Sequence, residues 1–284
     1  MFPQLFDPVK LRKGIDRFVD GIVTDYGDSL GALSDHFDRW LAWFEKLLRV
    51  APWWSVVLAV IVIAWLLTRR IGLSLLMGGL LCVIGLLGLW DAGMQTLALM
   101  LMATFLSVVI GIPVGILMGR LDWVRAVLHP VLDIMQTMPS FVYLIPVVML
   151  FGLGKTPALI ATIIYAVAPL IRLTDLGIRL VDKEVLEASR AYGANAWQQL
   201  FGVQIPLALP NIMAGINQTT MMALAMVVIA SMIGATGLGQ EVLLGINRLE
   251  VGRGLMAGVS IVVLAILFDR ITQAYGRRQR RGAH

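Results

Sequence analysis

The sequence predicts an all-α, polytopic membrane protein, and three observations support this expectation. Of the 284 residues, 58% are hydrophobic and 14% are charged. Soluble domains carry about 25% charged residues, and a water-soluble globule could not cover so much apolar surface. No Asp, Glu, Lys or Arg occurs between Ala191 and Gln240. Several other apolar runs approach the roughly 20 residues that a helix needs to cross a bilayer.

Seven apolar runs are interpreted as transmembrane helices. Arg69 and Arg70 separate the first two, because two arginines at the bilayer centre would cost several kcal/mol. The expected spans are 52–68, 71–90, 93–118, 134–153, 157–173, 208–234 and 254–268.

Basic residues gather at alternate junctions between these spans. By the positive-inside rule those junctions face the cytoplasm, so the N-terminus is expected outside and the C-terminus inside. The net charge of +5 is then explained by cytoplasmic anchoring and one interface, and no nucleic-acid partner is expected. The basic groups are Arg69 and Arg70; Arg120 and Arg125; Arg172, Arg179, Lys183 and Arg190; and Arg270, Arg277, Arg278, Arg280 and Arg281.

The chain divides into four parts. Residues 1–51 form a polar N-terminal extension, in which apolar residues at spacings of three and four predict an amphipathic helix on the membrane surface or against the spans. Residues 52–90 are two accessory spans, 91–275 the main membrane-spanning core with the polar segment of about 174–206, and 276–284 a basic cytoplasmic tail. The apolar residues of the extension are Leu30, Leu33, Phe37, Leu41, Phe44 and Leu48.

The long polar cytoplasmic segment, about residues 174–206, is expected to be a docking element. The charges of 172–190 predict a helix that Gly193 ends, since glycine favours the left-handed turn after a last helical residue. A second short helix follows, and Pro206 is expected to close it and start the next span. A solvated connector would not explain the aromatic residues Trp197 and Phe201 at this water-facing position.

This segment resembles a known signature. Glu187-Ala188-Ser189 is followed after three residues by Gly193, and after nine more by Val203-Gln204-Ile205-Pro206. The pattern resembles the EAA loop of binding-protein-dependent ABC importer permeases, with Ser189, Val203 and Ile205 as mild departures. The resemblance implies that the loop fits a groove in a separate ATPase subunit.

The resemblance also implies roles for particular residues. Glu187 would pair with a basic group of the ATPase, and Ala188 would permit close contact. Ser189, Gly193 and Pro206 complete the expected coupling residues. The chain itself is expected to bind no cofactor and to be no enzyme, because the partner subunit would use the ATP.

Further stretches narrow the resemblance to glycine betaine/proline betaine/choline permeases, over about residues 90–275. This implies a type I importer core in the bacterial inner membrane, a homodimer of permeases, a periplasmic solute-binding protein and a quaternary amine as the small-molecule substrate. A permease of the same class for another small solute, such as an amino acid, and an ion-coupled secondary transporter remain as alternatives. The stretches are 135–146, 171–174, 215–219, 233–239 and 243–252.

Candidate residues of the translocation path are Pro139, Tyr143, Asn217 and Gln218. Proline breaks in a transporter often line the path, although a plain kink at Pro139 fits equally well. Polar side chains at 217–219 either link helices or line a pore.

Two other features predict no chemistry. One cysteine and three histidines offer too few ligands for a metal site. Gly154-Lys155-Thr156 resembles the end of a phosphate-binding loop, but Met149 replaces the loop's first glycine.

Gly111, Gly115 and Gly119 form a small-residue face, for which packing within the chain is favoured over a dimer contact.

Overall fold

The computed structural model describes residues 8–282, and in this part of the chain the regular structure is entirely helical. Four described helices are long and apolar enough to cross a membrane, or up to six spans if two sharply bent helix pairs each count as one. The all-α expectation is confirmed, whereas the count of seven spans stays a prediction. The four long segments are Trp90–Arg120 (α4), Lys155–Arg179 (α7), Ala196–Ile233, which contains α10 (Ile205–Ile229), and Val251–Gln273 of α12 (Val251–Gly282).

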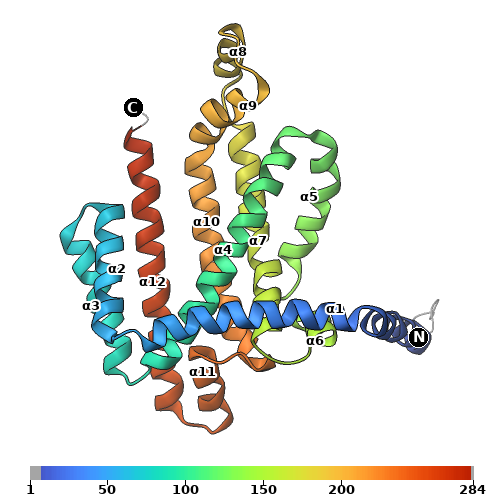
Figure 1. Cartoon of the computed structure of the whole chain (residues 1–284), viewed down its shortest axis with the longest axis vertical. Helices are drawn as coiled ribbons and strands as arrows, with labels where there is room; N and C mark the ends of the chain where they lie inside the picture. Colours follow the sequence, from blue (N-terminus) through green and yellow to red (C-terminus); the bar gives the residue numbers. More distant parts are fainter. Residues whose placement is uncertain (1–7, 283–284) are drawn as a thin grey trace, which may run out of the picture.

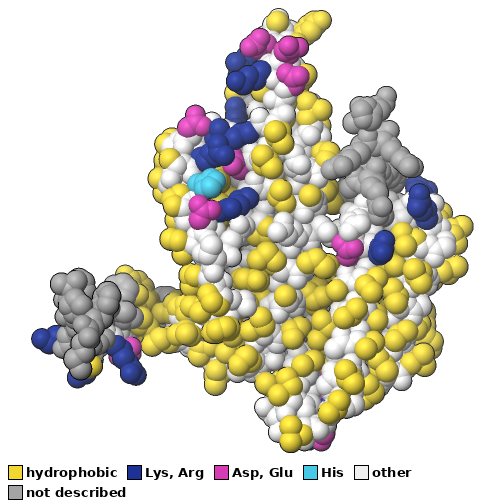
Figure 2. All heavy atoms as spheres, turned by 180° about the vertical axis from the view of Figure 1, so that it is seen from behind, with side chains coloured by type: hydrophobic (Ala, Val, Ile, Leu, Met, Phe, Trp, Pro, Cys, Tyr) yellow, Lys and Arg dark blue, Asp and Glu magenta, His cyan; other side chains and the backbone are white. Residues whose placement is uncertain are grey.

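The long helices run side by side, and α1 (Pro8–Val50) lies across one end of them (Figure 1). The C-terminus of the described chain and α8 (Lys183–Ala191) lie towards the opposite end. In Figure 2, hydrophobic side chains cover much of the visible face, while charged groups gather at the α8 end and on α1. This is the surface expected of a protein embedded in a bilayer, with polar groups at its two ends.

The two accessory helices are shorter than a full span. They are α2 (Trp53–Thr68) and α3 (Ile71–Leu86), each of 16 residues. At a rise of about 1.5 Å per residue, each helix is about 24 Å long. Arg69 ends α2 in the left-handed region, with a φ of 54°. The expected division at Arg69 and Arg70 is therefore confirmed, but α3 ends before the predicted residue 90.

The fourth expected span, 134–153, is wrong in its start and its shape. Helix α5 (Asp122–Thr137) begins well before residue 134, and the chain then turns by 114° into the short helices η1 (Ser140–Tyr143) and α6 (Leu144–Phe151). Pro139 causes the break, because it cannot donate a hydrogen bond and it holds the preceding Met138 in an extended conformation, at ψ 136°. The hydropathy pattern did not indicate the first half of α5, because this half carries the charged residues Asp122 and Arg125.

The polar segment differs from the expectation in two details. The predicted helix at 172–190 is split, because α7 ends at Arg179 and Asp182 caps a new helix, α8. The second short helix, α9 (Ala196–Gln199), does not stop at Pro206. It continues through a π-helical turn, η2 (Leu200–Gln204), into α10, and Pro206 lies in the first turn of α10, where a missing N–H is tolerated.

Helices α4 and α7 pack closely along the small-residue face. A Cβ added at Gly115 would lie 2.5 Å from Cβ of Thr174 and 2.8 Å from the carbonyl oxygen of Ile171, and one at Gly119 would lie 2.9 Å from Cβ of Ile178. The expected packing within the chain is confirmed.

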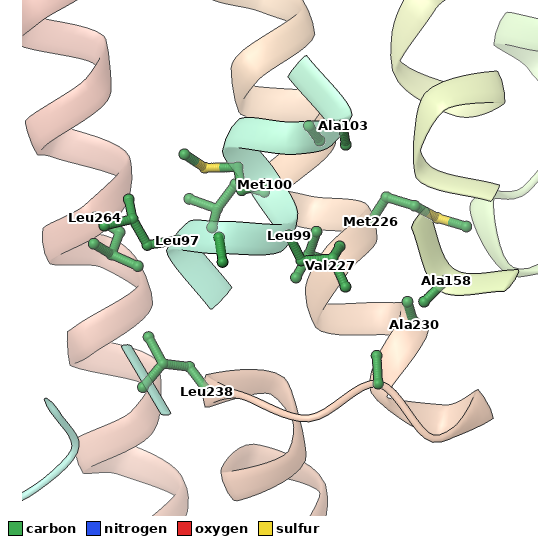
Figure 3. Packing of buried hydrophobic residues seen from close by; sticks show 14 of the residues in the cluster. Leu97, Leu99, Met100, Ala103, Ala158, Met226, Val227, Ala230, Leu238 and Leu264 are labelled. Carbon is green, nitrogen blue, oxygen red and sulfur yellow. The ribbon is translucent and has the colours of Figure 1, made fainter. Parts of the chain in front are cut away.

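The main core is built from helices distant in sequence. Figure 3 shows Leu97 and Met100 of α4, Met226 of α10 and Leu264 of α12 in one packed layer, together with Leu238 of α11 (Leu238–Asn247). The side chains of Met100, Met226, Leu238 and Leu264 are fully buried. This core holds α4, α10 and α12 together and thereby positions the loop between α7 and α10.

Candidate coupling loop and translocation path

Helix α8 projects from the ends of α7 and α10 and buries none of its residues. The carboxylate of Asp182 accepts a hydrogen bond from the backbone N–H of Glu184 at 2.9 Å and so caps the helix start. At the other end, Gly193 adopts a φ of 83°, and the N–H of Ala194 donates to the carbonyl of Ser189 at 3.1 Å. Gly193 therefore ends the helix as the sequence predicts.

A second anchor fixes α9 beneath α8. Asn195 and Gln198 form a reciprocal capping box at the start of α9. The buried amide of Gln199 donates to the carbonyl of Leu186 at 2.8 Å, which ties the two short helices together. Leu200 is buried against Ile178 and its neighbours in the core. The loop is thus a preformed element with a rigid attachment to α7 and α10.

The exposed surface of this element is rich in aromatic and apolar groups. Tyr192 is 93% exposed, and Trp197 stacks on Phe201 with ring centroids 5.8 Å apart. Glu187, Ala188 and Gly193 are also exposed, whereas Ser189 is half-buried. Pro206 is exposed at the start of α10, below this tip. The tip therefore exposes aromatic side chains together with a carboxylate, and aromatic residues are enriched at protein–protein interfaces.

An ionic cluster supports the base of the loop. Asp175 is only 4% exposed and pairs with Arg179 at 2.9 Å and with Arg125 at 3.4 Å. Arg179 also donates to Asp122 at 2.8 Å and to the carbonyl of Met118 at 3.0 Å. The cluster joins α4, α5 and α7. Sequence reasoning missed it, although the spacing of four between Asp175 and Arg179 was a signal.

The candidate path residues fall into two groups. Pro139 and Tyr143 lie at the break after α5, where the Tyr143 hydroxyl donates to the carbonyl of Met135 and its ring lies 5.7 Å from that of Tyr165 in an edge arrangement. The other two residues lie on α10 and make none of the described contacts with the first group.

On α10, the polar residues mainly link helices. The side-chain amide of Asn217 donates to Asp269 at 3.2 Å and accepts from Thr272, so it joins α10 to α12. Thr219 donates to the carbonyl of Ala166 at 2.8 Å and joins α10 to α7. Gln218 is exposed. Of the two interpretations of this stretch, helix linking accounts for the observed contacts, and a role in the path stays a prediction.

At the opposite end, α1 is fastened to the core by charged side chains. Glu45, 7% exposed, pairs with Lys155 at 2.5 Å and with Arg49 at 3.3 Å, and Arg49 also pairs with Asp91 at 3.1 Å. The hydrogen bond to Asp91 raises the pKa of Arg49. Lys155, part of the sequence that resembles a phosphate-binding loop, therefore serves as a structural ion-pair partner of α1.

No group of three or more His, Cys, Asp or Glu side chains suited to a metal ion occurs within residues 8–282. The lone cysteine, Cys82, is half-buried in α3. Several of the charged groups of this part of the chain instead form ion pairs between helices, as Glu45 does with Lys155 and Arg125 with Asp175.

Comparison with known proteins agrees with this architecture. Residues 111–281 match the family model of the binding-protein-dependent transport system inner membrane component. The glycine betaine/proline betaine transport system permease protein ProW of Escherichia coli is 46% identical over 272 residues, which cover 96% of this chain and 77% of that protein. The glycine betaine transport system permease protein OpuAB of Bacillus subtilis is 45% identical, with 91% of this chain and 92% of that protein covered.

A solved structure shares the fold. In an inward-facing structure of the MetNI methionine ABC transporter, one chain superposes with a TM-score of 0.58 at 23% identity, covering 69% of this chain and 96% of that chain. The family assignment rests on the extent of the family match and on the sequence identity to the two permeases, because the solved structure shows a shared fold alone. The chain belongs to the family of binding-protein-dependent transport system inner membrane components, the permeases of ABC importers.

Proposed function

We propose that this chain is the membrane-spanning subunit of an ATP-driven importer for quaternary amines such as glycine betaine, proline betaine or choline. The observation that carries the proposal is the preformed α8–α9 element, whose exposed tip bears Glu187, Ala188 and Gly193 in the spacing of the coupling loop. The substrate class rests on relatives named for glycine betaine and proline betaine transport, at 46% and 45% identity.

Two copies of the chain would work with two ATPase subunits in the bacterial inner membrane, and a periplasmic solute-binding protein would deliver the substrate. Glu187 would pair with a basic group of the ATPase, while Trp197 and Phe201 would be covered by the same partner. Closure of the ATPase dimer on ATP would then move the α8–α9 element. Because Leu200 and the η2–α10 continuation attach that element directly to a long span, the movement would reach the translocation path.

The base of the loop would transmit the same movement to a second place. Arg179 and Asp175 join the end of α7 to α4 and α5, and α5 leads directly to the broken segment at Pro139. A displacement of α8 would thus alter both α10 and the bend between α5 and α6. Pro139 and Tyr143 would be the path residues that respond.

The proposal is tested with Glu187→Lys, which reverses the charge at the exposed tip. We expect ATP-driven uptake of radiolabelled glycine betaine, and the amount of ATPase subunit that co-purifies, to fall at least about tenfold, as for loss of one partner of a buried interfacial charge pair. The matched control is Glu184→Lys on the same helix, which costs only about 0.3–1 kcal/mol at the helix N-terminus. Unchanged uptake and co-purification in Glu187→Lys, or equal losses in both variants, would contradict the assigned coupling role.

A further inference from the structure

The π-helical turn η2 lies between α9 and α10, which run on as one helix from Ala196 to Ile233. Within this turn the N–H of Ile205 donates to the carbonyl of Leu200, five residues earlier. An α-helix uses a spacing of four residues, so the turn takes up one extra residue. Single π-helical turns inside α-helices occur frequently at functional sites.

The buried side of α10 shows how a straight helix would be oriented. It is marked by residues three or four positions apart, which are Ala208, Ile212, Gly215 and Thr219. An α-helix turns by about 100° per residue, so extending this line backwards places Phe201 and Trp197 each within about 20° of Ala208. The same extension places Gln199 about 180° away, on the opposite side. In a straight helix, the aromatic pair Trp197 and Phe201 would therefore point towards α7.

The observed exposure is the reverse of this pattern. Trp197 and Phe201 are 68% and 61% exposed, whereas Gln199 and Leu200 are only 5% and 4% exposed. The extra residue moves Leu200 into the orientation that Phe201 would have in a straight helix. There Leu200 packs in one cluster with Ile178 of α7, and the side-chain amide of Gln199 is tied to α8.

This orientation has a cost within the chain. It leaves two large aromatic side chains exposed, although burying them would be favourable. At the end of η2, the side-chain carbonyl oxygen of Gln204 is buried and has no hydrogen-bond partner among residues 8–282. A buried acceptor without a partner is also unfavourable. The stability of this chain alone therefore does not account for the turn.

We propose that η2 is a positioning element of the coupling loop, whose extra residue turns the aromatic pair away from α7 and towards the ATPase subunit. The inference rests on the proposed function, in which that subunit covers Trp197 and Phe201. The turn also keeps the loop anchored, because Leu200 takes the place of the pair in the core. The residues of η2 thus act through the orientation of the pair.

The experiment changes the number of residues in the turn. Deletion of Gly202 removes the extra residue, so a straight helix keeps Leu200 buried and the aromatic pair outward. Insertion of one alanine after Gly202 adds a further residue and turns the pair by about 100° towards α7. Gly202→Ala keeps the residue count and is the matched control, since nothing lies within 4 Å of its added methyl group.

The first measurement is the amount of ATPase subunit that co-purifies with the full-length chain. The deletion and Gly202→Ala should retain the wild-type amount. The insertion should lower it at least about fivefold, as for loss of an aromatic residue from an interface. A flexible connector would tolerate both changes of length, and an ordinary α-helical segment would tolerate neither.

The second measurement reports the orientation of the pair in the purified chain. In a Cys82→Ser background, Phe201→Cys and Gln199→Cys are each treated with a maleimide reagent that cannot enter the protein core. With the natural spacing and with the deletion, Phe201→Cys should be labelled and Gln199→Cys protected, whereas the insertion should reverse this order.

Three results would each overturn the inference: equal effects of the deletion and the insertion on co-purification, loss of the folded chain on deletion, and an insertion that does not reverse the order of labelling. Neither measurement uses a transported solute. Uptake of glycine betaine by the wild type therefore judges the proposed substrate separately.

Discussion

The contact between α4 and α7 gives the most quantitative prediction, through Gly115→Ala. The added methyl group would meet Cβ of Thr174 at 2.5 Å and the carbonyl oxygen of Ile171 at 2.8 Å. Real Cβ atoms essentially never approach that closely, and a backbone oxygen cannot rotate away, so the helices must separate. Overpacking of this kind costs about 1–3 kcal/mol, whereas replacing a glycine within a helix by alanine gains about 0.5–1 kcal/mol. Because the backbone contact makes a large cost of overpacking the expected case, that cost should exceed the gain. We expect Gly115→Ala to lower the free energy of unfolding by about 1–2 kcal/mol.

The assay is thermal unfolding in detergent, followed by size-exclusion chromatography of the heated protein. Gly111→Ala should be milder, because its nearest contact is the flexible end of Leu170 at 3.0 Å. Gly258→Ala on α12 is the control for helix propensity, since nothing lies within 4 Å of its added methyl group. Gly115→Ala should therefore unfold at a lower temperature than the wild type, and Gly258→Ala at an equal or higher one. Equal stability of the Gly115 and Gly258 variants would refute the proposed close packing.

Two further predictions concern polar contacts outside the loop. The buried N–H of Leu238 donates to the hydroxyl of Thr96 at 2.8 Å. Thr96→Val should remove this acceptor and destabilise the chain by about 1–3 kcal/mol, while Thr96→Ser should keep most of the stability in the same unfolding assay. The side chain of Lys155 is 33% exposed and that of Asp91 is 71% exposed. Glu45→Gln should therefore lower the free energy of unfolding by about 1–3 kcal/mol, less than the loss of a fully buried ion pair would. Asp91→Asn should lower it by less than about 1 kcal/mol, because the Asp91 ion pair is exposed to solvent. If Glu45→Gln and Asp91→Asn lowered the unfolding temperature equally, burial of Glu45 would not explain the strength of its ion pairs.

Much of the fold could be predicted because bilayer length is a strong constraint on sequence. The runs that became α4, α7, α10 and α12 were recognisable from hydropathy, and the turn at Arg69 from its charge. The shape of the α8–α9 element was predictable in part, and for a different reason. Gly193 ends a helix through its own backbone conformation, so the sequence indicated this helix end directly. The caps at Asp182 and Asn195 also act within three residues, but they were not identified from the sequence.

What sequence reasoning missed depends on contacts between distant helices. Nothing local indicates that Glu45 of α1 meets Lys155 of α7, or that Arg125 of α5 meets Asp175 of α7. The start of α5 was missed for a related reason. Its charged residues look like a polar loop until their partners are known: Arg172 of α7 pairs with Asp133, and this pairing lets a charged helix pack against the core.

The two ends of the molecule use these distant contacts differently. At the α8 end, the ion pairs of Asp175 and Arg179 brace the base of the α8–α9 element, while α8 itself buries none of its residues. If the proposed coupling role is correct, these ion pairs would help to transmit its movement to α4 and α5. At the α1 end, Glu45 is nearly buried between α1 and the core, so breaking its ion pairs would leave charge without a partner and would be costly. The α1 contact therefore behaves as a fixed part of the structure. It follows that the conformational changes of transport should leave the Glu45–Lys155 pair and the neighbouring hydrogen bond from Thr156 to Asp38, at 2.5 Å, intact. A chemical cross-link between cysteines placed at Asp38 and Thr156 should therefore leave uptake unchanged, and slowed uptake in the cross-linked protein would contradict a fixed α1.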